Sequence, residues 1–454
     1  MHLEKYDGDL KSADFLNLLM IDISGNIRVV TLPKGYINDK VLEDGIGFDA
    51  SNYGYAKVSN SDMVAIPDMS TAFIERRDIF KHVHVFCDVV SADDSRSVFA
   101  HYPRNVARAA KDYLKSKGIA DDVQMLAELE FYIFDQVQYS TSFNRSHYSV
   151  ESNEGLGDYA SSSPRFGLLK GYHRISPEDK YRDFRDRSVA LMEAAGVAVK
   201  YHHHEVAASQ LEVELDFMSI AEVGDKVCLA KWILRSVAEE MGLTVTFMPK
   251  PLNKVSGSSI HVHQFLEKGG KSIFPGDEVF NLSKEALSYT CGLLEHSLTG
   301  SLLAFTNPST NSFRRLVPGF EAPISANFAK GSRCAAVRIP SYVKKNETRI
   351  EYRTGDATAN IYYMLSAMVM AGVDGMIRKA DPIAKGFNSP EILDDKVFPL
   401  NLNSVLDSLV KDNSYLAPVF PQELIDLWVK IKREEAAYVY NAPTPQEYEL
   451  YYNS

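Results

Sequence analysis

Four short stretches of the chain place charged or imidazole side chains two or more residues apart within otherwise apolar, strand-like sequence. They are LAELEFYIF with Glu128 and Glu130, SSIHVHQF with His261 and His263, TRIEYRT with Glu351, and YHHHEVAASQLEVEL. Because successive side chains on a strand point to opposite faces, residues two apart share one face of a sheet. The side chains predicted to meet there are Glu128, Glu130, Glu205, Glu212, His261, His263, Arg349, Glu351 and Arg353.

Five carboxylates and two imidazoles in one cavity would repel one another and partly protonate unless cations were present. Divalent metal ions would remove this repulsion, so metal binding is the economical interpretation. Taken alone, a Glu-x-Glu pair is more often found on the wet face of a sheet, and a lone histidine is more often a satisfied core residue. The metal prediction therefore depends on the joint occurrence of the four stretches.

Composition sets broad limits on partners and location. The chain has 454 residues, 45% hydrophobic and 24% charged, which predicts a large catalytic domain with a smaller companion. The formal net charge of −11 argues against nucleic acid as the main partner. Four widely spaced cysteines are typical of reduced thiols, so a cytoplasmic location is expected. We expect no signal peptide and no membrane span, since the most apolar stretch, residues 361–373, is too short.

The elements that must position the polar pairs follow from periodicity and turn residues. LNLLMIDI and NIRVVTLP, joined by Ser24-Gly25-Asn26, predict a hairpin, and HVHVFCDVV predicts a later strand. A helix is expected at 103–117, and the domain boundary is placed just before it, which gives domains 1–102 and 103–454. Residues 136–170 are rich in Ser, Tyr and Asn and are interpreted as a loop or an insert.

Further helices are predicted between the strands that carry the polar pairs. Ser176-Pro177-Glu178-Asp179 is typical of a helix start, and Gly196 suits its end. The other helical patterns cover 220–241, 284–297, 359–378 and 422–439. Since strands and long helices alternate, the predicted fold class is α+β with a curved, mainly antiparallel sheet.

Six motifs occur in the order in which they are found in glutamine synthetase: FDAS, HHHEVAASQLEVEL, GSSIHVHQF, NPSTNSFRRLVPGFEAP, AAVRIP and RIEYR. From about residue 15 to its end the chain resembles this family, and NPSTNSFRRLVPGFEAP is the most specific motif. The resemblance implies a small N-terminal β-grasp domain and a catalytic domain with a curved antiparallel sheet flanked by helices. It also implies a homo-oligomer, a dodecamer of two hexameric rings with active sites between subunits.

The resemblance implies an activity as well. This is the ATP-dependent ligation of ammonia to L-glutamate through a γ-glutamyl phosphate intermediate, which gives L-glutamine, ADP and phosphate. Two or more Mg²⁺ or Mn²⁺ ions per site are implied, and a mainly oxygen ligand set with one histidine suits either ion. The implied ligand sets are Glu130, Glu205 and Glu212 for one ion, and Glu128, His261 and Glu351 for the other.

The remaining site residues divide by role in the same resemblance. Arg315 and Arg353 are implied to bind the carboxylates of glutamate, Gly257 lies in a loop implied to meet the substrate, and Tyr172 is implied to bind substrate beside Asp49. The residues implied to face the nucleotide are Phe217, His263, Arg338 and Arg349. Asp49 would attract ammonium and help to deprotonate it, Glu321 would shield the acyl phosphate and take a proton, and Arg333 would face the transferred group. Planar guanidinium groups suit both carboxylates and phosphates.

Each of these residues also has a simpler interpretation. Asp49 or Glu321 alone would be an ordinary turn residue, and Arg314-Arg315 would be a surface pair. The run His202-His203-His204 could be a solvated turn, and none of its members is assigned as a ligand. Only their occurrence together, in the order of the family, favours the catalytic roles.

Several positions depart from the family pattern and keep three hypotheses open. They are Ser256, where asparagine is common, Asn52 and Phe265, where serines are usual, and Asn346, where a lysine is expected and only Lys345 is near. The leading hypothesis is a glutamate–ammonia ligase. The second is a γ-glutamyl ligase that acts on a larger amine or polyamine, which Ser256 and Asn52 would permit. The third is a catalytically silent structural or regulatory relative, which the six retained metal ligands disfavour.

Overall fold

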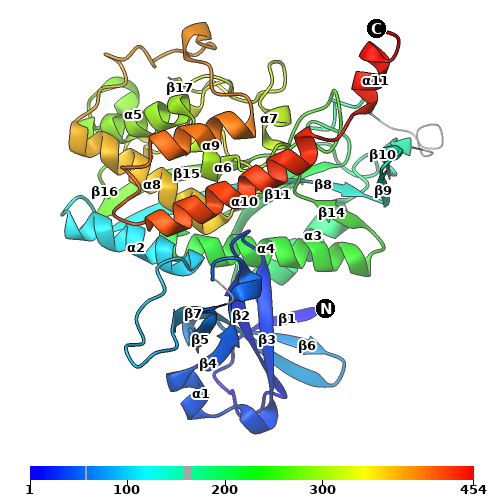
Figure 1. The fold of residues 1–454 in the computed structure, drawn as a ribbon, viewed down its shortest axis with the longest axis vertical. Coiled ribbons are helices and arrows are strands. Elements are labelled where there is room, and N and C mark those ends of the chain that lie inside the picture. The colour runs from blue at the N-terminus through cyan, green and yellow to red at the C-terminus, as the bar shows by residue number, and fades with distance from the viewer. Residues whose placement is uncertain (57–58, 158–165) are drawn as a thin grey trace.

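The N-terminal part of the chain forms a seven-stranded sheet, drawn in blue at the bottom of Figure 1. The computed structural model describes residues 1–56, 59–157 and 166–454. Along the path β1-β6-β7-β2-β3 every pair is antiparallel except β2–β7, and β5 links β4 to β7. The elements are β1 (His2–Lys5), β2 (Phe15–Ile21), β3 (Ile27–Pro33), α1 (Asp39–Asp44), β4 (Ile46–Asp49), β5 (Asp62–Pro67), β6 (Phe73–Arg77) and β7 (Phe80–Ser91).

Strand β2 separates two hydrophobic cores. Its alternate residues Leu16, Leu18 and Met20 pack in the core of the N-terminal sheet, whereas Leu19 and Ile21 belong to the large core that continues into the rest of the molecule. This division follows from the two-residue period of a strand whose two faces are both apolar. The predicted hairpin is confirmed as β2 and β3, and the predicted later strand lies within β7.

Polar contacts tie this sheet to helices α2 (Pro103–Ser116) and α4 (Ile220–Glu240). The buried guanidinium of Arg104 on α2 donates to both oxygens of Asp225 on α4, each at 2.9 Å. It also donates to Asp88 at 2.6 Å and to Asp68 at 3.0 Å, and both of these residues belong to the N-terminal part. Because a buried guanidinium requires paired carboxylates, this network holds the two parts in one relative position.

The remainder of the chain is organised around a ten-stranded sheet with the order β11-β12-β8-β15-β19-β18-β17. All of its pairs are antiparallel except β17–β18, and three short strands pair with β8 or β15. The strands are β8 (Asp122–Phe134), β11 (Val199–His204), β12 (Gln210–Leu215), β13 (Met218–Ser219), β14 (Thr244–Thr246), β15 (Ile260–Lys268), β16 (Lys271–Ser272), β17 (Phe328–Lys330), β18 (Val337–Ile339) and β19 (Ile350–Tyr352).

Helices cover the apolar side of this sheet. Helix α4 packs on β8 and against α2, α3 and α8, and α5 packs along α8. Figure 1 shows α10 crossing the front of the catalytic part and α11 extending away from it at the C-terminus. The further helices are α3 (Arg182–Ala194), α5 (Lys284–Thr299), α6 (Leu303–Thr306), α7 (Ser312–Arg315), α8 (Ile361–Arg378), α9 (Leu402–Lys411), α10 (Gln422–Tyr440) and α11 (Pro445–Tyr451). In the described part of the chain, no helix combines the length and the apolar character that crossing a membrane requires.

The structure adds to one expectation about local structure and corrects another. Within the stretch 136–170, strands β9 (Gln136–Ser142) and β10 (Arg145–Glu151) pair as an antiparallel hairpin, while residues 158–165 lie outside the described residues. Most of the hairpin's side chains are exposed on both faces, so no hydrophobic alternation marks it in the sequence.

The helix predicted from Ser176 begins only at Arg182 as α3. The segment before it is held as a turn, because Asp179 is buried and its carboxylate accepts from Tyr181 N–H and from the Arg185 guanidinium. Serine, proline and acidic residues favour both turns and helix starts, so the sequence pattern did not distinguish these structures.

Candidate active site

Cross-strand pairing brings the polar residues of different strands into rows. In one row His203 of β11 pairs with Glu212 of β12, which pairs with Glu130 of β8. Since paired residues on neighbouring strands present their side chains on the same face, two carboxylates and an imidazole meet there. Glu205 follows β11 directly, and its carboxylate lies 3.7 Å from His203 Nδ1.

A second row crosses the same strands two residues further on. Tyr201 pairs with Glu214, Glu214 with Glu128, and Glu128 with His261 of β15. A third row pairs His263 with Glu351 of β19 and Glu351 with Arg338 of β18. The opposite faces of the same strands carry Leu129, Val262, Ile350 and other fully buried apolar residues. The alternation predicted from the sequence is therefore confirmed.

Except for Glu214 and His263, the residues of these rows line a cavity of about 400 Å³. Most of the residues predicted for the site line it, although they come from segments that are far apart in the sequence. The predicted residues that line the cavity are Glu128, Glu130, Tyr172, Glu205, Glu212, Gly257, His261, Arg315, Glu321, Arg333, Arg338, Glu351 and Arg353.

Three of the other predicted residues lie together beside the cavity. The Arg349 Nε–H group donates to His263 Nδ1 at 3.3 Å, and its guanidinium lies 5.4 Å from the centre of the Phe217 ring. His263 Nε2 in turn lies 2.7 Å from Glu128 Oε1. Asp49 is different: it is exposed at the end of β4 in the N-terminal part, and it does not line this cavity.

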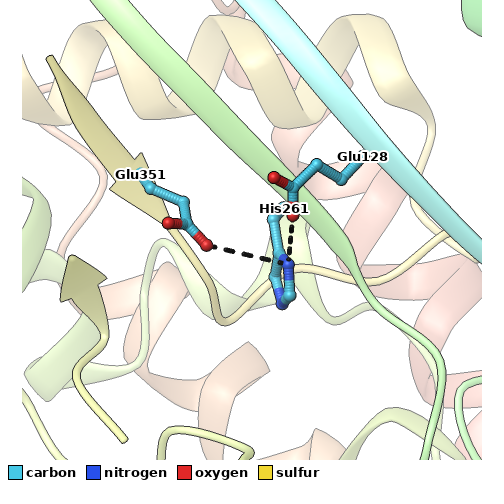
Figure 2. Close-up of side chains that lie close together, drawn as sticks. All are labelled: Glu128, His261 and Glu351. Carbon is cyan, nitrogen blue, oxygen red and sulfur yellow. Dashed lines mark hydrogen bonds and ion pairs between the residues drawn. The ribbon is translucent and has the colours of Figure 1, made fainter. Parts of the chain in front are cut away.

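Glu128 is at the centre of the histidine-rich half of the cavity. Its Oε2 lies 2.8 Å from His261 Nδ1, and His261 Nδ1 lies 3.8 Å from Glu351 Oε1. Figure 2 shows these three side chains converging from β8, β15 and β19. Burial opposes the charge on Glu128, but the neighbouring His263 and His261 outweigh it and hold the pKa of this carboxyl well below its usual value.

Glu205 and Glu212 are in the opposite electrostatic situation. Burial, followed by repulsion from Glu212 and Glu130, raises the pKa of Glu205 well above its usual value. Burial, followed by Glu128 and Glu130, raises the pKa of Glu212 in the same direction. A cation among these carboxylates would favour their charged forms and remove the repulsion. This donor set therefore fits a divalent ion.

Glu351 is fully buried and already carries two guanidinium partners. Arg338 lies 2.5 Å from its Oε2, and Arg353 forms an ion pair with its Oε1. Burial opposes the charge, but Arg353 and then His263 lower the pKa of Glu351 to about 2. Glu351 is therefore ionised at neutral pH, and any ion that it binds shares it with these arginines.

Backbone carbonyl groups and Gly257 pack closely around Arg315. Its guanidinium donates to the carbonyl oxygens of Thr354 at 2.7 Å and Arg353 at 3.0 Å. A Cβ atom at Gly257 would lie 2.8 Å from Arg315 Cγ and 2.5 Å from the carbonyl oxygen of Pro249, so only glycine fits there. Arg315 is thus a rigidly placed cation, with part of its guanidinium available to the cavity.

A short loop closes one side of the cavity. Glu321 lies in this loop at a φ of 55° with its side chain mostly exposed, and its carboxylate is 4.0 Å from Arg333. The Lys250 ammonium lies 4.1 Å from the ring centre of the neighbouring Phe320. Tyr172 lines the same side and packs against His203 at 5.4 Å between ring centres.

Sequence reasoning missed three residues of the site. His203 lies with Glu205 and Glu212 in a group whose ligand atoms could hold a metal, whereas the prediction gave it no ligand role. Glu214 is fully buried beside Glu128 and Glu212, and Lys200 lines the cavity. The spacing of Glu212-x-Glu214 matches that of Glu128-x-Glu130, so the i, i+2 rule could have found Glu214.

Two groups of potential metal ligands contain some of the residues predicted for the two ligand sets. Glu128, His261 and Glu351 form one potential metal group as predicted, and Glu205 and Glu212 form the other with His203 in the place predicted for Glu130. Glu130 lies close to the other group, since its Oε1 is 4.0 Å from His261 Nδ1. Its Oε2 accepts a hydrogen bond from Ser259 N–H at 2.8 Å.

Comparisons with known proteins agree with this architecture. The glutamine synthetase catalytic domain matches residues 100–451, and the glutamine synthetase beta-Grasp domain matches residues 12–92. A glutamine synthetase of Mycolicibacterium smegmatis is 36% identical, with 98% of this chain and 97% of that protein covered. One of Salmonella typhimurium is 35% identical, with 97% and 96% covered. The solved structure of Plasmodium falciparum glutamine synthetase superposes with a TM-score of 0.89 at 26% identity, with 98% and 97% covered.

The fold and the matched domains define a two-domain carbon–nitrogen ligase. The chain belongs to the glutamine synthetase family, the family of glutamate–ammonia ligases. The expected family, the fold class with its β-grasp domain, and the enzyme class are thereby confirmed.

Proposed function

We propose that this cavity carries out glutamine synthesis in two steps. The side-chain carboxylate of L-glutamate attacks the γ-phosphorus of ATP, which forms γ-glutamyl phosphate and releases ADP. Ammonia then attacks the acyl carbon, the C–O bond to phosphate breaks, and a proton leaves the new amide nitrogen. The observation that carries the proposal is the convergence of five buried carboxylates, two imidazoles and four guanidinium groups on one cavity in a chain of this family.

Two divalent ions, Mg²⁺ or Mn²⁺, fit the acidic groups. When bound, such ions neutralise phosphate charge and align the reacting oxygens. The proposed holders are His203, Glu205 and Glu212 with the adjacent Glu130 for one ion, and Glu128, His261 and Glu351 for the other. His203 is an addition to the predicted ligand set, supported by its distance of 3.6 Å from Glu212.

The arginines are proposed to hold the substrates. Arg315 and Arg353 would bind the carboxylates of glutamate near Gly257 and Tyr172. Both arginines line the cavity, and the Arg315 guanidinium is held by a hydrogen bond to the backbone carbonyl of Thr354. Arg338, Arg349 and His263 would face the phosphates of ATP, and Phe217 would pack against the base. A guanidinium fork suits each of these anions, since it can donate two parallel hydrogen bonds.

The amine half of the reaction is assigned to Asp49, Glu321 and Arg333. Glu321 and Arg333 lie on the closing loop side of the cavity, where they could shield the acyl phosphate. Asp49 does not line the cavity of its own chain, so we propose that a neighbouring subunit supplies it. A supply of Asp49 from the neighbouring subunit agrees with the proposed oligomer, which is two hexameric rings with active sites between subunits. Separately, we propose that the boundary between the two domains lies between residues 102 and 103. We also propose a cytoplasmic location.

The test of the function is phosphate release from ATP with glutamate and a panel of amines that includes ammonium, methylamine and a polyamine. We expect ammonium to give the highest kcat/KM and L-glutamine as the product identified by mass spectrometry. Strong turnover with an alkylamine or polyamine and poor turnover with ammonium at every concentration would instead establish the larger-amine ligase.

A charge-conserving substitution tests the glutamate site. Arg315→Lys should raise the KM for glutamate roughly tenfold or more, because a fork that makes several charge-assisted hydrogen bonds is replaced by a point charge. The KM for ATP should change much less. Steady-state kinetics with each substrate varied, together with a melting curve to check folding, make the measurement. Equal effects on both substrates would show that Arg315 does not select glutamate.

A further inference from the structure

Strand β11 contains an irregularity next to the cavity. Its pairing with β12 shifts between Val199 and Tyr201, so Lys200 is the extra residue of a β-bulge. Bulges next to active sites re-aim side chains. Neighbours on a regular strand point to opposite faces, but Lys200 and Tyr201 both line the cavity. The backbone thus brings an ammonium group into the site that simple alternation would have turned away.

A buried carboxylate holds this ammonium group. Lys200 Nζ donates to Glu214 Oε1 at 2.6 Å, and Glu214 has no exposed surface. The other oxygen of Glu214 has no hydrogen-bond partner among the described residues. Lys200 Nζ also lies 5.0 Å from the centre of the Tyr201 ring. A lysine has three donors, so the contact with Glu214 leaves donors for a ligand in the cavity.

The position of Lys200 complements the arginines. The guanidinium groups that line the cavity all come from residues 315–353, whereas Lys200 comes from β11 at the opposite edge of the sheet. Glu214 pairs across the strands with Glu128, and Glu128 contacts His263, which contacts Arg349. Lys200 therefore lies beside the row that leads to the half of the site proposed for the nucleotide. Lys345, the lysine nearest to the position where the family has one, pairs with Asp277 instead and does not line the cavity.

We propose that Lys200 contacts the phosphate oxygens of the nucleotide, and that Glu214 is the positioning residue that holds its ammonium group before the nucleotide binds. This inference rests on the proposed ligase function. A polyphosphate that enters a cavity with five buried carboxylates needs cationic contacts, and a lysine provides a compact charge with rotatable donors. Arginines on one flank and Lys200 on the other would hold the phosphate chain from both sides.

A simpler explanation is that Lys200 only neutralises Glu214. A single substitution does not separate the two explanations, because Lys200→Met leaves a buried, unpaired carboxylate and destabilises the fold under either. The double variant Lys200→Met/Glu214→Gln removes both charges and so avoids that penalty. If Lys200 only neutralises Glu214, this double variant should behave as the wild type; if Lys200 binds phosphate, it should bind ATP weakly.

The experiment compares the wild type, the double variant, Lys200→Arg and a control in the complete enzyme with Mg²⁺. The readouts are glutamate-dependent phosphate release with ATP or glutamate varied, calorimetric binding of Mg-ATP, and the melting temperature. In the double variant we expect a KM and a Kd for ATP raised about tenfold to a hundredfold, since one hydrogen bond between charged groups is lost. Its KM for glutamate should change by less than about twofold. Lys200→Arg, which keeps the charge, should recover much of the ATP affinity.

The matched control is Lys385→Met. Lys385 pairs with Glu295 at the same distance of 2.6 Å, but the pair lies outside the cavity, so neither KM should change. A double variant with unaltered KM and Kd for ATP would overturn the phosphate contact and leave Lys200 with a neutralising role. An inactive wild type that does not bind Mg-ATP would overturn the proposed function itself, and this inference with it.

Discussion

Glu212→Gln is expected to lower kcat by at least about a hundredfold while raising the melting temperature of the metal-free protein. The loss of activity follows because replacing even a residue that only hydrogen-bonds to a metal ligand typically lowers metal affinity or activity about ten- to a hundredfold. Replacing a proposed ligand itself should cost at least as much. The gain in stability follows because Glu212 is buried beside Glu128 and Glu130, which repel its charge. An uncharged amide of the same shape removes that repulsion, so the same substitution should act in opposite directions on function and on stability.

Metal titration makes this prediction quantitative. Mg²⁺ or Mn²⁺ should raise the melting temperature of the wild type. At a metal concentration a hundred times the Kd, the free energy of unfolding should increase by about 2.7 kcal/mol. Glu212→Gln should lose most of this gain. The measurement is thermal unfolding over a metal series that starts in a chelator, with Glu423→Gln on the exposed surface of α10 as the control. Unchanged melting of the wild type with either metal would contradict the assignment of the acidic groups as metal sites.

The local pattern of the site was readable from the sequence, because a strand has a strict two-residue period. Glu128 and Glu130 fall on one face and Leu129 on the other without any knowledge of the fold. The register between strands was not readable in this way. The pairing of Glu212 with Glu130 joins strands that are about 80 positions apart, and only the folded sheet specifies it.

Other features depended on backbone irregularities or on burial. Lys200 enters the cavity because of a bulge, and no residue type at that point signals one. The β9–β10 hairpin pairs through its backbone while its side chains remain mostly exposed, so hydrophobic periodicity could not mark it. The sequence gives His203 no ligand role, since the resemblance places the metal on Glu205, but the β11–β12 pairing places His203 opposite Glu212.

In the proposed function Asp49 serves the cavity of a neighbouring subunit, and the effect of replacing it should be specific to the amine step. Asp49→Ala should retain glutamate-dependent phosphate release but lose most ammonium-dependent glutamine formation, with ammonium saturation shifted far upward. The reason is that a carboxylate both attracts the ammonium cation and accepts its proton, whereas activation of glutamate needs neither. Asp62→Ala is the matched control, because Asp62 is exposed and pairs directly with Asp49 across β4 and β5.

Mixed oligomers test where Asp49 acts. If each cavity receives Asp49 from the neighbouring subunit, co-assembly of Asp49→Ala subunits with Glu212→Gln subunits should restore part of the activity that each variant lacks alone. Some interfaces would then combine an intact cavity from one subunit with an intact Asp49 from the next, as head-to-tail contacts in a ring allow. Mixing the two variants without dissociation and reassembly should restore nothing. If Asp49 served the cavity of its own chain, every site in the mixed oligomer would still lack one essential carboxylate, and glutamine formation would stay at the level of the separate variants.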